Sequence, residues 1–334
     1  MKWRVRRPLV SVILAAYNHE DTVEEAVRSV LDQSMDDLEL IVVDDASTDR
    51  TAEVVAGMED SRIRLIRNRR NGERHPRNFA LSLARGSWVG FQNSDDVWET
   101  SKLASQLELF GRRPELSVVF TDVVRINGRG EALSGRGPFL DPAEQPEDAT
   151  SGWLRRFLLQ HNCVAIASAL ARRRDLARVG GMDPQLRQLA DFDLWIRLAA
   201  RGGCAIHPGA LTKVRFFDDG SNMSAGRPEV TRRTFWEQTR VLRRFAESSA
   251  LKWLPSVLPE LGVNGSADVL ERKMALARFA SENPQPAFRL WAEWLLSELI
   301  RTEEKELQRR GLWMEATRGL RDLRASLHPP VVEP

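Results

Sequence analysis

Cysteine is scarce in this sequence, because the 334-residue chain contains only Cys163 and Cys204. They form no CxxC pair and no disulfide framework, and each lies in an apolar stretch, so we expect both to be small core residues. The histidines show no HxxxH-like spacing, so we expect no zinc site. These five histidines are His19, His75, His161, His207 and His328.

Long hydrophobic runs are also missing. No stretch reaches the roughly 18 apolar residues that a membrane-spanning helix needs. The apolar run at residues 9–16 is short and ends at the polar Tyr17 and Asn18, which does not resemble a signal peptide. We therefore expect a cytoplasmic protein, and the sequence leaves open a peripheral contact with the inner face of the membrane.

Neither sign of charge dominates, since 49 lysines and arginines face 47 aspartates and glutamates for a net charge of +2. A nucleic-acid-binding protein usually concentrates basic residues in a stripe, and this sequence does not, so we expect no nucleic-acid partner. The chain also lacks a GxGxxG after its first strand, a GxxxxGK[ST] loop and a GxSxG elbow. Dinucleotide-binding, P-loop and serine-hydrolase functions lose their main support.

The first two thirds of the chain alternate between strand and helix patterns. Short apolar runs rich in Val and Ile are typical of buried parallel strands, and amphipathic stretches separate them. This alternation predicts an α/β fold, with a mostly parallel sheet flanked by helices. Asp21 and Glu24 predict a capping box at the first helix. The expected strands are residues 9–16, 38–43, 63–66, 88–91, 116–121 and 205–217.

The character changes after about residue 225, where strand patterns end and amphipathic helical periodicity continues. We expect a domain at residues 1–224 and an all-helical C-terminal domain at residues 225–334. Half of the ten tryptophans fall in the helical domain, and we interpret them as core residues or as a seam against the first domain. The alternative is a helix that faces anionic lipid or a partner, with Arg232, Arg233, Arg240, Arg243 and Arg244.

Carboxylates follow predicted strands at two places, Asp44-Asp45 and Asp95-Asp96, and Asp191 with Asp193 begins a later helix. Aspartate is common in caps and turns, which is the structural alternative for each. Ligands of open α/β sheets bind beyond the carboxyl ends of the strands, which is where these groups fall. The pair Asp95 and Asp96 offers hard oxygen ligands for Mn²⁺ or Mg²⁺, and such an ion can bind a diphosphate.

Several segments together resemble the family 2 glycosyltransferases, in that family's order and spacing over residues 9–224. Residues 42–51 (VVDDASTDRT) resemble its VDDGSTDxT motif, and residues 90–98 (GFQNSDDVW) its acidic metal motif. The other matching segments are VSVILAAYN at 10–18, Arg77-Asn78, GGMD at 180–183 and DFDLWIR at 191–197.

The resemblance implies a GT-A nucleotide-diphospho-sugar transferase fold and an inverting, metal-dependent sugar transfer to an acceptor hydroxyl. A UDP-sugar is the expected donor, and cell-surface polysaccharide or glycoconjugate synthesis the expected setting. Asp191 would be the general base, and Asp95 and Asp96 would hold Mn²⁺ or Mg²⁺. The resemblance assigns the nucleotide sugar to Ala15, Tyr17, Asp45, Arg77, Asn93, Ser94 and Asp95.

Three positions depart from the family pattern. Asn93 stands where many members have Asp, Ala190 replaces the usual Glu before the base, and Phe217 falls where many relatives carry a metal-reaching His. These departures keep open a catalytically impaired binding or assembly protein. A sugar-phosphate nucleotidyltransferase is a further alternative, although residues 15–21 are not its Gly-rich loop.

The Gln-x-x-Arg-Trp motif of processive polysaccharide synthases is absent, which favours transfer of a single sugar. The sequence leaves the acceptor and the oligomeric state open.

Overall fold

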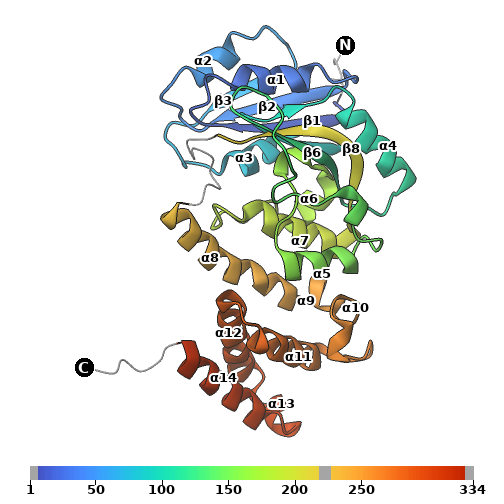
Figure 1. Ribbon diagram of the computed structural model, residues 1–334, viewed down its shortest axis with the longest axis vertical. Helices are drawn as coiled ribbons and strands as arrows, with labels where there is room; N and C mark the ends of the chain where they lie inside the picture. The colour runs from blue at the N-terminus through green and yellow to red at the C-terminus, as the bar shows by residue number, and fades with distance from the viewer. Residues whose placement is uncertain (1–6, 218–226, 328–334) are drawn as a thin grey trace, which may run out of the picture.

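The computed structural model describes residues 7–217 and 227–327, with an α/β layer at one end and a group of helices at the other (Figure 1). One eight-stranded sheet forms the centre of the α/β layer. Its strands are β1 Val10–Ala16, β2 Leu38–Asp44, β3 Ile63–Arg67, β4 Trp88–Asn93, β5 Val97–Trp98, β6 Val118–Ile126, β7 Leu170–Arg172 and β8 Cys204–Arg215.

The sheet order is β3-β2-β1-β4-β7-β6-β8-β5. Parallel pairing joins β3, β2, β1 and β4, so the carboxyl ends of these strands lie along one edge. β7 is antiparallel to both β4 and β6, and β5 is antiparallel to β8. The expected mostly parallel sheet is confirmed, and β5 and β7 are additions that the sequence pattern did not indicate.

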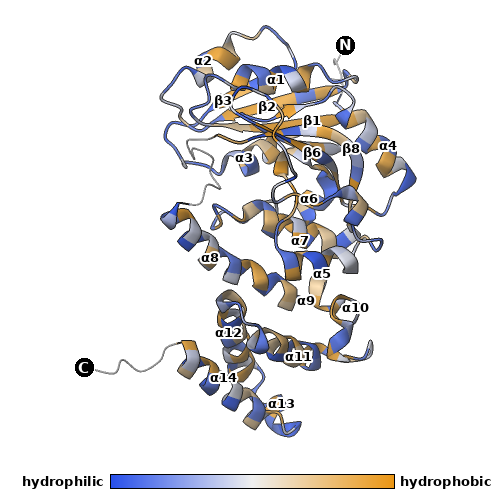
Figure 2. Cartoon of the chain, viewed as in Figure 1, coloured by the Kyte–Doolittle hydropathy of each residue, from blue (hydrophilic) through white to orange (hydrophobic). Residues whose placement is uncertain are grey.

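Alternate residues of β1 pack against different helices, as the pleat of a strand requires. Val12 and Leu14 belong to a core with α1, α2 and α4, whereas Ile13 belongs to a core with α3, α5, α6 and α7. Both sheet faces are therefore covered, and the hydrophobic strands lie between helices in Figure 2. These helices are α1 Val23–Leu31, α2 Thr51–Ala56, α3 Pro76–Leu83, α4 Lys102–Arg112, α5 Ser151–Gln160, α6 Arg173–Val179 and α7 Ala190–Gly202.

The described chain from residue 227 onward is helical. The core under α7 continues into these helices through Leu242, Phe245 and Trp291. The elements are α8 Pro228–Leu242, α9 Ser248–Leu251, α10 Leu254–Val257, α11 Val269–Glu282, α12 Pro286–Thr302, α13 Glu304–Arg309 and α14 Trp313–Leu327, with 3₁₀ turns η1 Pro142–Glu144, η2 Ile166–Ser168, η3 Arg243–Ala246 and η4 Pro259–Leu261. The expected boundary near residue 225 lies outside the described residues and stays a prediction.

The aromatic and cysteine side chains follow the expectation in part. Cys163 and Cys204 are buried free thiols, as expected. Trp291 is fully buried, and Trp253, Trp294 and Trp313 pack against the same core. Trp236 differs, because 59% of its surface is exposed. No helix among the described residues has the length and apolar character needed to cross a bilayer.

The predicted capping box at α1 is wrong. Thr22 occupies the cap position, and no side chain accepts a hydrogen bond from the first turn. The Thr22 hydroxyl donates instead to the Ser94 carbonyl at 3.0 Å, which ties α1 to the loop after β4. The sequence pattern of a capping box is thus replaced by a contact between the start of α1 and the loop after β4.

Candidate active site

The carboxyl ends of β1, β2 and β4 lie side by side and define the strand-end rim. Ala15 of β1 is in register with Val43 of β2 and with Asn93 of β4. The loops that carry Tyr17, Asp45 and Asp95 therefore leave the sheet from adjacent strands. The Tyr17 side chain is 45% exposed, so its ring is available for stacking.

The loops after β1 and β2 hold each other in place. The Asn18 amide oxygen accepts a hydrogen bond from the Thr48 backbone at 2.8 Å, and the Asn18 backbone donates to the Ser47 hydroxyl at 3.0 Å. Asn18 and Ala46 adopt left-handed backbone angles, with φ of 52° and 62°. Ala46 stands where the resembled motif has glycine, the residue that adopts this conformation without strain.

The two carboxylates after β2 have different surroundings. Asp44 is fully buried and accepts a hydrogen bond from the Ser47 hydroxyl, so it shapes the turn. Asp45 accepts from the Asn68 amide at 2.6 Å and from the Gly72 backbone at 3.1 Å. Asp45 thus fixes the loop that leads into α3, on which Arg77 lies.

A hydrogen-bonded chain links Arg77, Asn93 and Asp96. Arg77 donates to the Asn93 amide oxygen at 2.7 Å, and the Asn93 amide nitrogen donates to Asp96 at 2.8 Å. An aspartate at position 93 could accept from Arg77, but it could not donate to an ionised Asp96. The Arg77 Nε has no hydrogen-bond partner among the described residues although it is shielded from solvent.

Asp95 and Asp96 are adjacent carboxylates in a protein-lined environment. Burial raises the pKa of Asp95, and burial together with the neighbouring Asp95 raises the pKa of Asp96 to about 8. The Arg215 backbone donates to Asp96 at 2.9 Å, and the Arg215 side chain donates to the Asp95 carbonyl at 2.8 Å. These contacts compensate the two charges only in part.

Asp191 lies in the first turn of α7 and also faces Arg77. Burial raises the pKa of the Asp191 carboxyl, while the Arg77 charge and a hydrogen bond from Asn162 act in the opposite direction. Asn162 donates at 3.1 Å to one carboxylate oxygen, and the Phe192 backbone donates to the other at 2.8 Å. Burial lowers the pKa of Arg77, and the charges of Asp191, Asp95 and Asp96 act in the opposite direction, so all three carboxyl groups lie near this guanidinium.

Helix α8 supports the start of α7. The buried Glu237 carboxylate of α8 accepts from the backbone N–H groups of Arg187, Gln188 and Leu189 at 2.9, 2.7 and 2.9 Å. Backbone donors that precede a helix have no intrahelical acceptor, so this carboxylate satisfies them. The segment that leads into Asp191 is therefore anchored by the helical part of the chain.

Asp193 differs from Asp191 although it lies two residues away. It is buried and forms ion pairs with Arg197 of α7 and Arg244 of η3. Arg244 and Arg240 also contact Asp183. These two arginines thus bind carboxylates within the chain, and the alternative of a helix that faces anionic lipid or a partner stays a prediction.

Sequence reasoning missed His19 and Asn162 as members of this site. The His19 imidazole contacts the Ser94 hydroxyl at 2.6 Å, and its charge lowers the pKa of Asp95. The ring of His19 lies 6.4 Å from the ring of Phe217. Phe217 is the residue that falls where the family resemblance leads us to expect a histidine. His19 directly follows the segment at 10–18 that resembles the family, and this position could have indicated a site residue. The sequence around Asn162 contains no such motif.

The residues present fit a divalent cation that is completed by substrate. Among the described residues no group of three or more His, Cys, Asp or Glu could hold a metal ion. Mg²⁺ and Mn²⁺ sites in nucleotide-binding enzymes commonly use one or two carboxylates together with phosphate oxygens and water. Asp95 and Asp96 supply such a pair just after β4.

Comparison with known proteins identifies the family. Residues 11–176 match the model described as "Glycosyl transferase family 2". The chain belongs to this family. The match covers the strands and loops that carry Tyr17, Asp45, Arg77 and Asp95-Asp96, and it ends before α7.

A relative in the family is the Escherichia coli UDP-Glc:alpha-D-GlcNAc-diphosphoundecaprenol beta-1,3-glucosyltransferase WfaP, which is 43% identical over 100 residues. That segment is 30% of this chain and 40% of WfaP, so the match spans less than half of the relative's length.

Two solved structures have the same GT-A fold. S. aureus TarS 1-349 in complex with UDP-GlcNAc gives a TM-score of 0.58 at 19% identity, over 95% of this chain and 90% of that chain. Mannosyltransferase PcManGT from Pyrobaculum calidifontis, in complex with GDP-Man and Mn²⁺, gives 0.52 at 19% identity, over 95% and 88%. The expected GT-A fold is confirmed by these neighbours.

Proposed function

We propose that this chain is an inverting glycosyltransferase that moves a single sugar from a nucleotide-diphosphate sugar to an acceptor hydroxyl. The observation that carries the proposal is the arrangement around Arg77, which brings Asn93, Asp95, Asp96 and Asp191 to one rim of the sheet. Family membership and the donors named for WfaP and TarS support a UDP-sugar.

The donor would bind across the strand-end rim. We assign the nucleotide to Ala15, Tyr17 and Asp45, with the exposed Tyr17 ring against the base and Arg77 near the diphosphate. Asn93 and Ser94 would contact the donor next to Asp95. The unpartnered Arg77 Nε is a donor suited to a phosphate oxygen, because an anion there would satisfy a shielded N–H group.

Asp95 and Asp96 would hold Mn²⁺ or Mg²⁺, which would neutralise charge on the departing nucleotide diphosphate. The Mn²⁺ in the PcManGT complex supports a divalent ion in this fold. Phe217 replaces the histidine of many relatives, and we propose that the nearby His19 imidazole takes the place of that histidine beside Asp95.

Asp191 would act as the general base for the acceptor hydroxyl. Its raised pKa makes it a better proton acceptor than an exposed carboxylate, and Asn162 and the Phe192 backbone fix its orientation. An acceptor oxygen within roughly 3 Å of Asp191 would lose its proton as it attacks the anomeric carbon, and the diphosphate would leave from the opposite side. This single displacement inverts the anomeric configuration.

The setting we propose is the synthesis of a cell-surface polysaccharide or glycoconjugate by a cytoplasmic enzyme. The diphosphoundecaprenol-linked acceptor in the name of WfaP supports an acceptor carried on lipid, which would bring the protein to the inner face of the membrane. We assign catalysis to residues 1–224 and support of the α7 segment to the helical residues 225–334, through Glu237.

The alternative of a catalytically impaired protein is motivated by the departures at Asn93, Ala190 and Phe217. The contacts of Asn93 weaken that motivation, because its side chain hydrogen-bonds to both Arg77 and Asp96.

Incubation with a panel of nucleotide sugars, with Mn²⁺ or with a chelator, separates the two functions. We expect slow, metal-dependent hydrolysis of one or a few donors, UDP-sugars among them. No hydrolysis of any donor would favour the non-catalytic alternative.

A further inference from the structure

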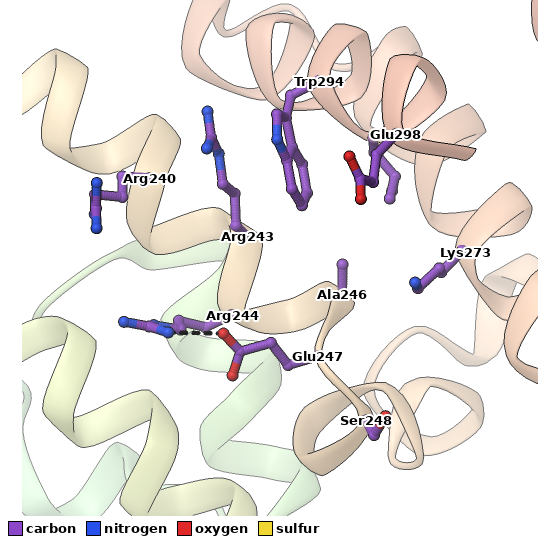
Figure 3. A pocket seen from close by; sticks show the side chains of 10 residues that line it. Arg240, Arg243, Arg244, Ala246, Glu247, Ser248, Lys273, Trp294 and Glu298 are labelled. Carbon is purple, nitrogen blue, oxygen red and sulfur yellow. Dashed lines mark hydrogen bonds and ion pairs between the residues drawn. The ribbon is translucent and has the colours of Figure 1, made fainter. Parts of the chain in front are cut away.

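A cleft that is distant in the sequence from the strand-end rim residues opens where η3 and α8 meet α11 and α12. The volume of this cleft is about 560 Å³, which is within the range of small-molecule sites. Figure 3 shows Arg243 of η3, Lys273 of α11 and Trp294 of α12 around the cleft. We call it the junction cleft, because it lies at the junction of α8 and η3 with α11 and α12.

Arg243 carries unsatisfied hydrogen-bonding capacity in this cleft. Its guanidinium carbon lies 4.5 Å from the centre of the Trp294 ring, which orients the planar group. The shielded Nε has no hydrogen-bond partner, and the side chain forms no ion pair with any described residue. Burial and the neighbouring Arg240 lower the pKa of Arg243, so an anion there would relieve both costs.

Lys273 adds a second uncompensated cation from the opposite wall. Its half-buried side chain extends from α11 toward Ala246 (Figure 3). Within residues 7–217 and 227–327 it has neither a hydrogen bond nor an ion pair. Lysine is usually left in water unless a partner is at hand, so a half-buried lysine at a cleft wall is a candidate anion contact.

The other charged groups of the junction cleft already have partners. Arg244 binds Asp193 and Glu247, and Arg240 contacts Asp183. Glu298 forms an ion pair with Arg301 at 2.7 Å. Glu247 and Glu298 thus have cationic partners, whereas Arg243 and Lys273 have no anionic partner in the described part of the chain.

We propose that the junction cleft binds a phosphate-bearing ligand, with Arg243 and Lys273 as its ion-pair donors. A phosphate monoester carries close to two negative charges, which matches two cations, and a diphosphate carries more. A guanidinium held flat by Trp294 suits two parallel hydrogen bonds to phosphate oxygens. Ala246 and Leu295 supply apolar wall for the carbon groups next to the phosphate. The proposal does not depend on the transferase reaction.

Calorimetry with inorganic pyrophosphate in chelator tests the site, since metal-dependent binding at the strand-end rim is then suppressed. We expect salt-sensitive binding that Lys273→Gln weakens several-fold and that Arg243→Gln/Lys273→Gln weakens by about tenfold or more. The matched control is Lys305→Gln/Arg321→Gln, which removes the same charges at exposed positions of the helical part. The control should bind as the wild type does.

Lys273→Gln keeps the test decisive if Arg243→Gln destabilises the fold, because Lys273 has no hydrogen bond or ion pair to lose among the residues that the structure describes. Thermal unfolding of every variant reports folding. Unchanged pyrophosphate affinity in Lys273→Gln, or equal losses in the matched control, would overturn the proposal.

Sedimentation with phosphatidylcholine vesicles that contain phosphatidic acid, whose headgroup is a phosphate monoester, distinguishes the source of the phosphate. Binding of soluble pyrophosphate without vesicle binding indicates a free ligand. Vesicle binding that the double variant abolishes and the matched control retains indicates a lipid headgroup. Absence of both kinds of binding in the wild type contradicts the proposal.

Discussion

Carboxylates at the strand-end rim and carboxylates on the C-terminal helices lie in opposite environments. At the rim, burial and a neighbouring carboxylate raise the pKa of Asp96 to about 8. On α13, hydrogen bonds from Arg309 and Arg310 lower the pKa of the partly exposed Glu306 to about 2. Both regions are rich in charge, but Glu306 has two arginine partners, whereas Asp96 lies beside a second carboxylate.

This difference in environment separates the acidic groups that are candidates for chemistry from those that are not. Surface ion pairs such as Glu306 with Arg309 are solvated and contribute little to stability. A buried carboxylate without a full set of partners lowers the stability of the folded protein, and such groups are found mainly at functional sites. The strand-end rim therefore has the properties of a site, and most acidic residues of the helices have those of a solvated surface.

The largest expected effect follows the loss of the base. Asp191→Asn should lower turnover by roughly 10²–10⁴-fold, because an amide cannot accept the acceptor proton. Donor affinity, measured by calorimetry, should stay near the wild-type value. The matched control is Asp322→Asn on α14, an exposed position where the same change should leave turnover intact. Near-normal turnover in Asp191→Asn would show that another group is the base.

Removal of a metal ligand should come next. Asp96→Asn should weaken UDP binding in the presence of Mn²⁺ by at least about tenfold, since one of two carboxylates is lost. Calorimetry with Mn²⁺ and with chelator measures the difference. Equal wild-type affinity in both conditions would remove the metal role of Asp95 and Asp96.

The same residue predicts a pH dependence of stability in the metal-free protein. The pKa of Asp96 is about 8 in the folded state, and an unfolded aspartate titrates near 4. Between these values the folded state holds the extra proton, so stability should fall as pH rises from about 4 to about 8. Thermal unfolding in chelator should show a flatter profile in Asp96→Asn, and an unchanged slope would refute the assignment.

A matched pair of glutamates sharpens the regional contrast. Glu237→Gln places an amide nitrogen opposite at least one of three backbone N–H donors, which should cost about 1–3 kcal/mol. Turnover should fall more than donor affinity, because the segment before Asp191 loosens. Glu306→Gln, the same change on α13, should alter neither thermal stability nor turnover measurably. Equal effects of the two changes would contradict a supporting role for α8.

Sequence patterns predicted the parts of this molecule that depend on local order. Apolar runs identified the long strands, and the acidic pairs fall at strand ends because such sheets gather them there. The two-residue β5 and three-residue β7 have too few residues to show a periodicity. His19, Asn162 and Glu237 were missed because their partners lie 75, 29 and about 50 residues away.

The anomeric configuration of the sugar first released tests the central claim most directly. Proton NMR can follow hydrolysis of the preferred nucleotide sugar with Mn²⁺, before mutarotation mixes the anomers. If Asp191 activates the attacking oxygen for a single displacement, the first sugar should have the inverted configuration, and Asp191→Asn should release far less of it. Release of the retained anomer, or equal release by Asp191→Asn, would contradict the account.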